Sequence, residues 1–186
     1  MSKIVNLFGA PGSGKSTIAA GLFYELKLAG YSAELINEYA KSKVWSEDKF
    51  TLDNQAYVTI KQYYMQDRPN GKVQCIITDS PILLGLFYQR KGCTPSFKPY
   101  MLELFHQYNN INFLLKMSQC HRDSYSEMGR LQTYDESIQK EAEIESFLIE
   151  NGIEYISIEV NGRSTLETLK SHVEQKLTKP KMITFE

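Results

Sequence analysis

A run of eight residues near the N-terminus has the composition and spacing of a phosphate-binding loop. It matches the pattern GxxxxGK[ST] at every fixed position and reads Gly9-Ala10-Pro11-Gly12-Ser13-Gly14-Lys15-Ser16. Glycines in such a run allow the backbone to curl, so that its N–H groups point at phosphate oxygens. An apolar run precedes the loop and a helix-period segment follows it, which argues against an ordinary glycine-rich turn.

The side chains at the end of this loop predict that it binds a nucleoside triphosphate and Mg²⁺. Lys15 is expected to reach the β- and γ-phosphates, Ser16 to ligate Mg²⁺ and Thr17 to contact the α-phosphate. The helix that begins near Lys15 adds the positive end of its dipole. The predicted nucleotide-binding residues are Gly9, Gly12, Ser13, Gly14, Lys15, Ser16 and Thr17.

Two carboxylates that follow short apolar runs are candidates for metal and proton chemistry. Asp79 follows Ile76-Ile77-Thr78, where it could hold Mg²⁺ through water, steer an acceptor, or cap the next helix. Glu38 follows Leu35-Ile36-Asn37 and could accept a proton from an attacking hydroxyl, or be a solvated surface residue. Which of the two acts as the base stays open at this point.

A polar stretch at 118–132 has no apolar period and carries two arginines, Arg122 and Arg130. Such a stretch is typical of a mobile lid, whose arginines can neutralise the charge of a transferred phosphoryl group. The alternative is a charged surface loop. The lid interpretation adds Arg122 and Arg130 to the predicted catalytic residues, beside Lys15, Glu38 and Asp79.

Short apolar runs alternate with helix-period segments along the whole chain, which predicts one α/β domain over residues 1–186. We expect a three-layer fold with a five-stranded parallel sheet in the order 2-3-1-4-5. In such sheets a site lies beyond the carboxyl ends of the strands, here just after residues 8, 37, 78 and 117. The expected strands are 4–8, 32–37, 73–78, 111–117 and 153–160, and the expected helices are 16–28, 81–90, 97–108, 137–151 and 166–177.

One further helix is expected between the second and third strands, with Thr51 and Asp53 as candidate N-caps and Pro69 beyond its end. The apolar period also predicts which side chains face inward. They are Ile18, Leu22 and Leu26 in the first helix, Leu52, Ala56, Ile60 and Tyr63 in this one, and Met101, Leu104, Phe105 and Tyr108 in the helix at 97–108.

The composition is that of an ordinary globular domain, with 42% apolar and 23% charged residues. The net charge of −1 gives no general attraction to nucleic acid, although a local basic groove would be compatible with it. Three separated cysteines without a CxxC pair favour a reduced, cytoplasmic setting. The longest apolar stretch, 82–88, is too short to span a bilayer, so no membrane association is expected.

Several classes of nucleotide-binding protein are set aside because their motifs are missing from the sequence. It has no Asn-Lys-x-Asp, which a guanine-specific switch protein needs, and no LSGGQ-like segment of a transporter-type ATPase. It is also short for an AAA+ motor, and no Asp-Glu pair ends a predicted strand. These absences favour ATP as the nucleotide and a small kinase as the class.

Residues 3–160 resemble the nucleoside and nucleotide kinase group of P-loop proteins, most of all its deoxyribonucleoside-kinase branch. The family has the same loop near its N-terminus, an arginine-bearing lid, and a Glu followed by a Trp, as Glu38 and Trp45 stand here. It also has a helix with a base-reading Gln, as in Asp53-Asn54-Gln55-Ala56-Tyr57. The chain is also similar to small P-loop kinases or ATPases of tailed phages, some of which phosphorylate hydroxymethyl groups on DNA bases.

The resemblance implies a role for each matching residue. Glu38 would be the base, Asp79 would order the metal or the acceptor, and Gln55 would bond the edge of an acceptor base. Trp45 and Tyr57 could stack on that base or lie in the core. The implied partner is a small-molecule nucleoside or nucleotide, or DNA bearing modified bases. A homodimer and a cytoplasmic location, in the host cell if the gene belongs to a phage, are also implied.

The sequence therefore predicts a phosphotransferase that uses ATP and Mg²⁺ on a nucleoside, nucleotide or modified nucleic-acid hydroxyl. One alternative is an ATPase that acts as a nucleotide-dependent switch with a protein or nucleic-acid partner. Another is a non-catalytic nucleotide-binding subunit, against which the intact Lys15, Ser16 and Asp79 argue.

Overall fold

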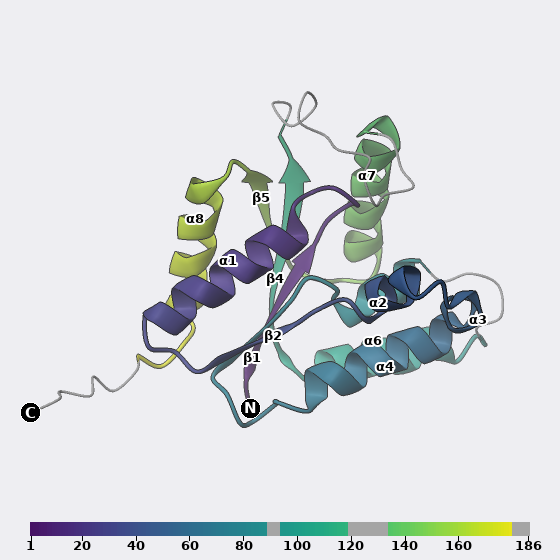
Figure 1. Cartoon of the computed structure of the whole chain (residues 1–186), viewed down its shortest axis with the longest axis horizontal. Helices are drawn as coiled ribbons and strands as arrows, with labels where there is room; N and C mark the ends of the chain where they lie inside the picture. Colours follow the sequence, from purple (N-terminus) through teal and green to yellow (C-terminus); the bar gives the residue numbers. More distant parts are fainter. Residues whose placement is uncertain (89–93, 119–133, 180–186) are drawn as a thin grey trace, which may run out of the picture.

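Five parallel strands form one sheet in the order β2-β3-β1-β4-β5, as the sequence predicts (Figure 1). The computed structural model describes residues 1–88, 94–118 and 134–179. All strands run toward the same end of the sheet, where the first strand leads into the glycine-rich loop (Figure 1). The strands are β1 (Lys3–Phe8), β2 (Ala33–Ile36), β3 (Cys75–Thr78), β4 (Asn109–Met117) and β5 (Ile156–Val160).

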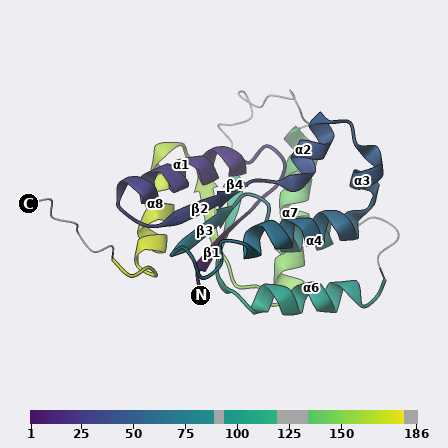
Figure 2. The same cartoon turned by 60° about the horizontal axis from the view of Figure 1, so that its bottom comes forward.

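The helices cover the sheet from both sides and make the three layers that alternating elements predict. Figure 2 shows α1 and α8 on one side of the sheet, and α4, α6 and α7 on the other. The helices in the described parts of the chain are α1 (Lys15–Leu28), α2 (Tyr39–Trp45), α3 (Lys49–Asp53), α4 (Gln55–Asp67), α5 (Ile82–Phe87), α6 (Phe97–His106), α7 (Tyr134–Glu150) and α8 (Arg163–Glu174).

Each face of the sheet buries its own apolar cluster because successive side chains of a strand point to opposite sides. Val5 and Leu7 of β1 pack with the buried faces of α1 and α8. Phe8 packs on the other side with residues of α5, α6 and α7. β3 lies between β2 and β1 and is buried along its whole length, as expected of a strand that helices cover on both faces.

The predicted inward faces are largely confirmed for α1 and α6, and only in part for the helix between β2 and β3. Ile18, Leu22 and Leu26 are buried in α1, and Met101, Leu104 and Phe105 are buried in α6. Tyr108 lies beyond the end of α6 and is only partly buried. Of the inward face expected for the helix between β2 and β3, Tyr63 packs against the core, whereas Ile60 is exposed.

That segment differs from the prediction because it folds into three helices instead of one. α2 was not expected, and the N-caps are Asp48 of α3 and Asn54 of α4, where Thr51 and Asp53 were predicted. The apolar period did not predict most of the buried face of α4. Three of its buried side chains are polar, and Ile60, which was expected to face inward, is 36% exposed. The buried residues of α4 are Val58, Thr59, Gln62 and Gln66.

None of the helices in the described ranges combines the length and the apolar character that crossing a membrane requires. Element ends otherwise lie within a few residues of their predicted positions. The strand ends after residues 8, 36, 78 and 117 therefore meet at one edge of the sheet, where the candidate site lies.

Candidate functional site

The loop between β1 and α1 has a backbone that only glycine allows at its key positions. Gly14 is the N-cap of α1 and has a left-handed φ of 80°, which side chains with a Cβ rarely adopt. Gly9 lies in a close approach of two chain segments. A Cβ there would lie 2.6 Å from Ser13 Oγ and 2.8 Å from the carbonyl oxygen of Leu115.

The start of α1 fits the anionic phosphates of a nucleotide. No side chain caps the helix N-terminus, and its first turn contains no acidic residue. Its first backbone N–H groups and the positive end of its dipole are therefore available to an anion. Ser13 Oγ is buried in the loop without a hydrogen-bond partner among the described residues, as expected of a hydroxyl that meets a ligand.

Lys15 lies across this loop. Its Nζ donates to the carbonyl oxygens of Gly9 and Ala10, each at 2.8 Å. The side chain thus holds its charge over the concave side of the loop, at the edge of the sheet where phosphates would bind. This position agrees with the predicted contact to the β- and γ-phosphates, which remains a prediction for the bound state.

Glu38 follows β2 and is partly buried, so the prediction of a fully solvated surface residue does not describe it. It is the N-cap residue of α2, but its carboxylate makes no capping hydrogen bond. Burial raises the pKa of its carboxyl, the charge of Lys15 lowers it, and the charge of Asp79 raises it further. The strand-end cluster of Lys15, Glu38 and Asp79 therefore brings together three residues that the sequence predicted for catalysis.

Asp79 follows β3 and is only 4% exposed. Its alternative role as the cap of the next helix is wrong, because the N-cap of α5 is Pro81. Asp79 Oδ1 is buried without a hydrogen-bond partner among the described residues. A buried carboxylate oxygen in that state is suited to a metal ion or to metal-bound water, since oxygen atoms are the ligands that Mg²⁺ prefers. Ser16 is exposed at the start of α1, on the same loop.

The predicted acceptor-binding residues lie on the three helices that follow β2. Trp45 ends α2 with 76% of its surface exposed, and Tyr57 of α4 is 49% exposed, so the core alternative is wrong for both. Tyr57 and Tyr39 of α2 meet edge to face, with ring centroids 6.2 Å apart. Gln55 is the first residue of α4 and is partly buried. Contacts of these residues with a nucleobase stay predictions.

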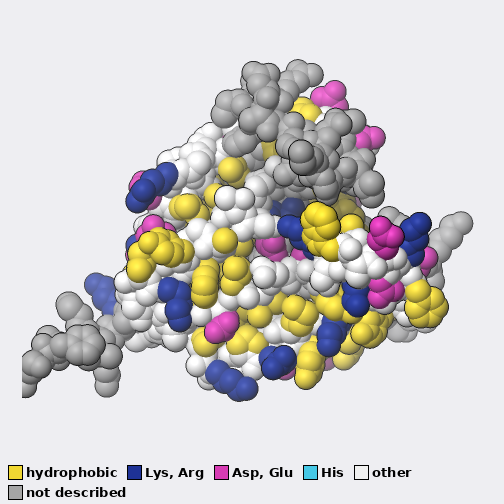
Figure 3. Space-filling view, viewed as in Figure 1, with side chains coloured by type: hydrophobic (Ala, Val, Ile, Leu, Met, Phe, Trp, Pro, Cys, Tyr) yellow, Lys and Arg dark blue, Asp and Glu magenta, His cyan; other side chains and the backbone are white. Residues whose placement is uncertain are grey.

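The surface of α2, α3 and α4 mixes apolar and charged side chains. Figure 3 shows hydrophobic side chains interspersed with lysine or arginine and acidic ones over this part of the molecule. Lys43 lies over the ring of Tyr39, and its Nζ also pairs with Asp48 at 3.3 Å. Aromatic rings beside cations are typical of surfaces that bind aromatic or anionic ligands.

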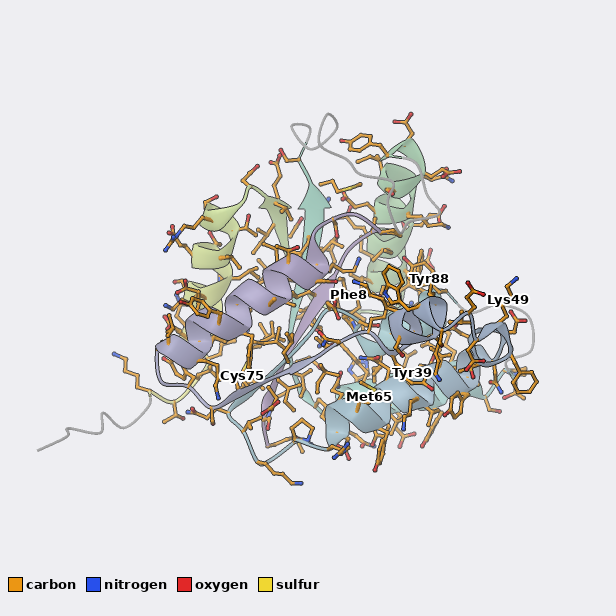
Figure 4. All side chains as sticks on the ribbon, in the orientation of Figure 1. Phe8, Tyr39, Lys49, Met65, Cys75 and Tyr88 are labelled. Carbon is orange, nitrogen blue, oxygen red and sulfur yellow. The ribbon has the colours of Figure 1, made fainter. Side chains whose placement is uncertain are left out.

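Two residues near the strand-end cluster belong to no sequence motif and were not predicted. Tyr88 follows α5, and Figure 4 places it beside α2 in that view. Burial raises the pKa of its hydroxyl to about 12, and the nearby charges of Glu38 and Glu143 act in the same direction. Gln62 of α4 is buried and bonds to the backbone on both sides of Glu38. Only their position after folding identifies these two residues.

The predicted lid lies almost entirely outside the described residues. Of the stretch 118–132, the structure describes only Ser118, which is buried. Arg122 and Arg130 fall outside the described ranges, so their predicted role in clamping phosphates stays a prediction.

Comparison with known proteins shows the family and the fold of the chain. A family model described as an AAA domain matches residues 4–165. None of the curated proteins searched matches the sequence significantly. Among solved structures, 170 chains match significantly.

Two of these structures illustrate the likeness. A NadR protein in complex with NAD and AMP-PNP has a TM-score of 0.61 and 13% identity, and the match covers 100% of this chain but 52% of that one. This chain therefore spans about half of the NadR chain, and at this identity the likeness shows the fold alone. A shikimate kinase from Bacteroides thetaiotaomicron matches with a TM-score of 0.49 and 12% identity over 93% of this chain and 97% of that one.

Proposed function

The chain belongs to the AAA domain family, and on that premise we propose that it is a phosphotransferase dependent on ATP and Mg²⁺. The acceptor is a hydroxyl of a nucleoside, a nucleotide or a modified nucleic acid. The proposal has support from the P-loop fold, and from a NadR protein of the same fold whose structure contains AMP-PNP.

The observation that carries the proposal is the strand-end cluster of Lys15, Glu38 and Asp79. A partly buried carboxylate beside the phosphate loop is suited to accept the proton of a hydroxyl that attacks the γ-phosphate. Burial raises the pKa of Glu38, which moves it toward the range in which a carboxylate is an effective general base. Asp79 offers a second carboxylate, which is buried and whose Oδ1 has no hydrogen-bond partner among the described residues, so that it could meet a metal.

Each residue of the cluster has its own role in the proposed reaction. ATP supplies the γ-phosphoryl group, and the Mg²⁺ bound with it would neutralise part of the charge on the phosphate oxygens. Glu38 accepts the proton of the acceptor hydroxyl as that oxygen bonds to the γ-phosphorus and the bond from phosphorus to ADP breaks. Lys15 holds positive charge against the phosphate oxygens, and Ser16 and Asp79 hold the metal directly or through water.

The acceptor lies between the cluster and the helices α2 and α4 in this proposal. Gln55, Tyr57 and Trp45 are the side chains proposed to contact it. The exposure of both aromatic rings favours a ligand with a planar ring, because stacking on a nucleobase buries such rings at low entropic cost.

The test is transfer of labelled γ-phosphate from ATP to a panel of acceptors. The panel contains deoxynucleosides, ribonucleosides, nucleoside monophosphates, 5′-hydroxyl oligonucleotides and DNA with hydroxymethylated bases. We expect label on one of these classes, dependent on Mg²⁺. Label that appears only as free phosphate, at a rate that no acceptor changes, would reject the transferase.

That second outcome would favour the other candidate, an ATPase switch with a protein or nucleic-acid partner. The family description favours this candidate, because it names an AAA domain and no kinase. ATP hydrolysis that depends on a macromolecule, with no labelled acceptor, would distinguish it from the transferase.

A further inference from the structure

The carboxylate of Glu38 sits in a short connection between β2 and α2 that a single side chain holds from both sides. Oε1 of Gln62 accepts a hydrogen bond from the backbone N–H of Tyr39 at 2.9 Å. Nε2 of the same side chain donates to the carbonyl oxygen of Asn37 at 3.3 Å. Residues 37 and 39 are the immediate neighbours of Glu38, so both bonds fix the backbone from which its carboxylate projects.

The partners leave the Gln62 amide only one orientation. An N–H needs an acceptor and a carbonyl oxygen needs a donor, so Oε1 and Nε2 cannot exchange places without losing both bonds. Gln62 is only 4% exposed, and a buried amide is costly unless it is hydrogen-bonded. The two bonds to the Glu38 segment satisfy this need.

The helix that carries Gln62 is itself packed closely against the segment that follows Asp79. Thr59, one turn before Gln62 on α4, lies so near Gly85 of α5 that a Cβ on that glycine would lie 2.6 Å from Thr59 Cγ2 and 2.9 Å from its Cβ. α5 begins shortly after Asp79, with Pro81 as its N-cap. The helix α4 therefore links the Glu38 backbone, through Gln62, to the element that follows the second carboxylate, through Thr59.

We infer that Gln62 is a positioning residue, which holds the Glu38 carboxylate toward Lys15 and Asp79 by fixing the backbone on both sides of it. In this role it acts through Glu38 and not by contact with the nucleotide or the acceptor. The inference deepens the proposed function and rests on it for its kinetic consequence, whereas its structural consequence can be measured without any acceptor.

The chain offers a matched control on the same helix. Gln66 lies one turn after Gln62 and is fully buried, but neither polar atom of its side chain has a hydrogen-bond partner among the described residues. Substituting Met for either glutamine removes an amide of similar size and burial. Only Gln62→Met removes bonds to the Glu38 segment.

The first measurement is amide hydrogen exchange, followed by mass spectrometry of peptides that contain Tyr39. In Gln62→Met we expect exchange at this amide to be about fivefold faster or more, the scale of one lost hydrogen bond. In Gln66→Met the same peptide should exchange as in the parent. Equal exchange in the parent and Gln62→Met would overturn the inference, whatever the enzyme proves to transfer.

The second measurement is phosphate transfer to the acceptor that the panel identifies. Gln62→Met should lower kcat by about tenfold to a hundredfold, the usual result of a misplaced catalytic group, and leave the KM for ATP within about twofold. Gln66→Met should leave kcat near the parent value. An equal loss in both variants would mean that packing of α4, and not the two bonds, sets the rate.

A double variant separates positioning from a general structural effect. If Gln62 acts through Glu38, adding Gln62→Met to Glu38→Gln should change kcat by less than about twofold, because the group that Gln62 positions is already missing. Independent, multiplying losses would overturn the inference and leave the proposed function intact. An unchanged rate in Glu38→Gln alone would instead reject Glu38 as the base, which is a failure of the proposed function.

Discussion

The phosphate side and the acceptor side of the proposed site are built in opposite ways. The proposed phosphate side comes from one continuous segment, residues 9–16, and the groups expected to bind are backbone N–H groups, one lysine and a buried hydroxyl. The acceptor side comes from three separate helices, α2 to α4, which expose aromatic rings. A triphosphate is the same for every enzyme of this fold, whereas the acceptor is not.

This contrast explains which half of the site can be recognised from a motif. Backbone geometry is set locally by glycines such as Gly9 and Gly14, so it is visible as a spacing in the sequence. Side chains that meet an acceptor depend on how helices pack, and packing leaves no fixed spacing. Between the two halves lie Glu38 and Asp79, which follow strands and are proposed to serve both halves.

The largest expected effect comes from the phosphate side. Lys15→Ala should lower transfer by about a thousandfold or more and weaken ATP binding, because it removes the cation expected to meet the transferred phosphoryl group. Steady-state transfer and ATP titration measure the two effects. Lys27→Ala, at the exposed far end of the same helix, is the control and should leave both unchanged. Normal turnover in Lys15→Ala would reject the phosphate-loop assignment.

Glu38→Gln tests whether Glu38 acts on the acceptor hydroxyl or takes part in binding ATP. It should lower transfer by about a hundredfold, the scale for a general base, and leave the Kd for ATP unchanged. Glu34→Gln, an exposed position in β2, is the matched control. An unchanged rate would move the role of base to Asp79, and a weakened affinity for ATP would place Glu38 on the phosphate side.

The fold and the phosphate side could be predicted because their signals are local or periodic. The strand order, the loop and both strand-end carboxylates were all expected, since parallel strands bring their carboxyl ends to one edge. The structure also excluded one alternative for Asp79, the role of helix cap, because the N-cap of α5 is Pro81.

The acceptor side could not be predicted to the same depth. The apolar period placed Ile60 inside, but α4 buries Thr59, Gln62 and Gln66 instead. Thr59 and Gln62 satisfy their polar atoms through bonds to Gln55 O and to the Glu38 segment, which no sequence period reports. Hydrophobic periodicity fails on this face of α4, because Thr59 and Gln62 are buried together with partners that only the folded chain supplies.

A smaller effect is expected from the exposed rings of the acceptor side. Trp45→Ala should raise the KM for the acceptor by about tenfold if a base stacks on the indole, since such stacking is worth about 1–3 kcal/mol. The free energy of unfolding should change by less than about 0.5 kcal/mol, because the ring is 76% exposed. Phe50→Ala, a ring on α3 that is 91% exposed, is the control. Equal KM values in both variants would exclude Trp45 from the acceptor site.

The smallest effect is a displacement of the pH profile, and it tests whether the two carboxylates act on each other. A base works only when deprotonated, so the rate should fall as the pH drops through the raised pKa of Glu38. The charge of Asp79 contributes to that rise. Asp79→Asn removes this charge, so the pKa of Glu38 should fall and the acid limb of kcat should move to lower pH.

The total rate of Asp79→Asn will also fall if Asp79 holds the metal, so the measurement is the position of the limb after each profile is scaled to its own maximum. Asp53→Asn, an exposed carboxylate at the end of α3, controls for general charge effects and should leave the limb in place. A limb that does not move in Asp79→Asn would mean that the acid limb reports a group other than Glu38. The phosphate side would then keep its assignment, and the search for the base would turn to the residues of the acceptor side, beginning with those around Tyr88.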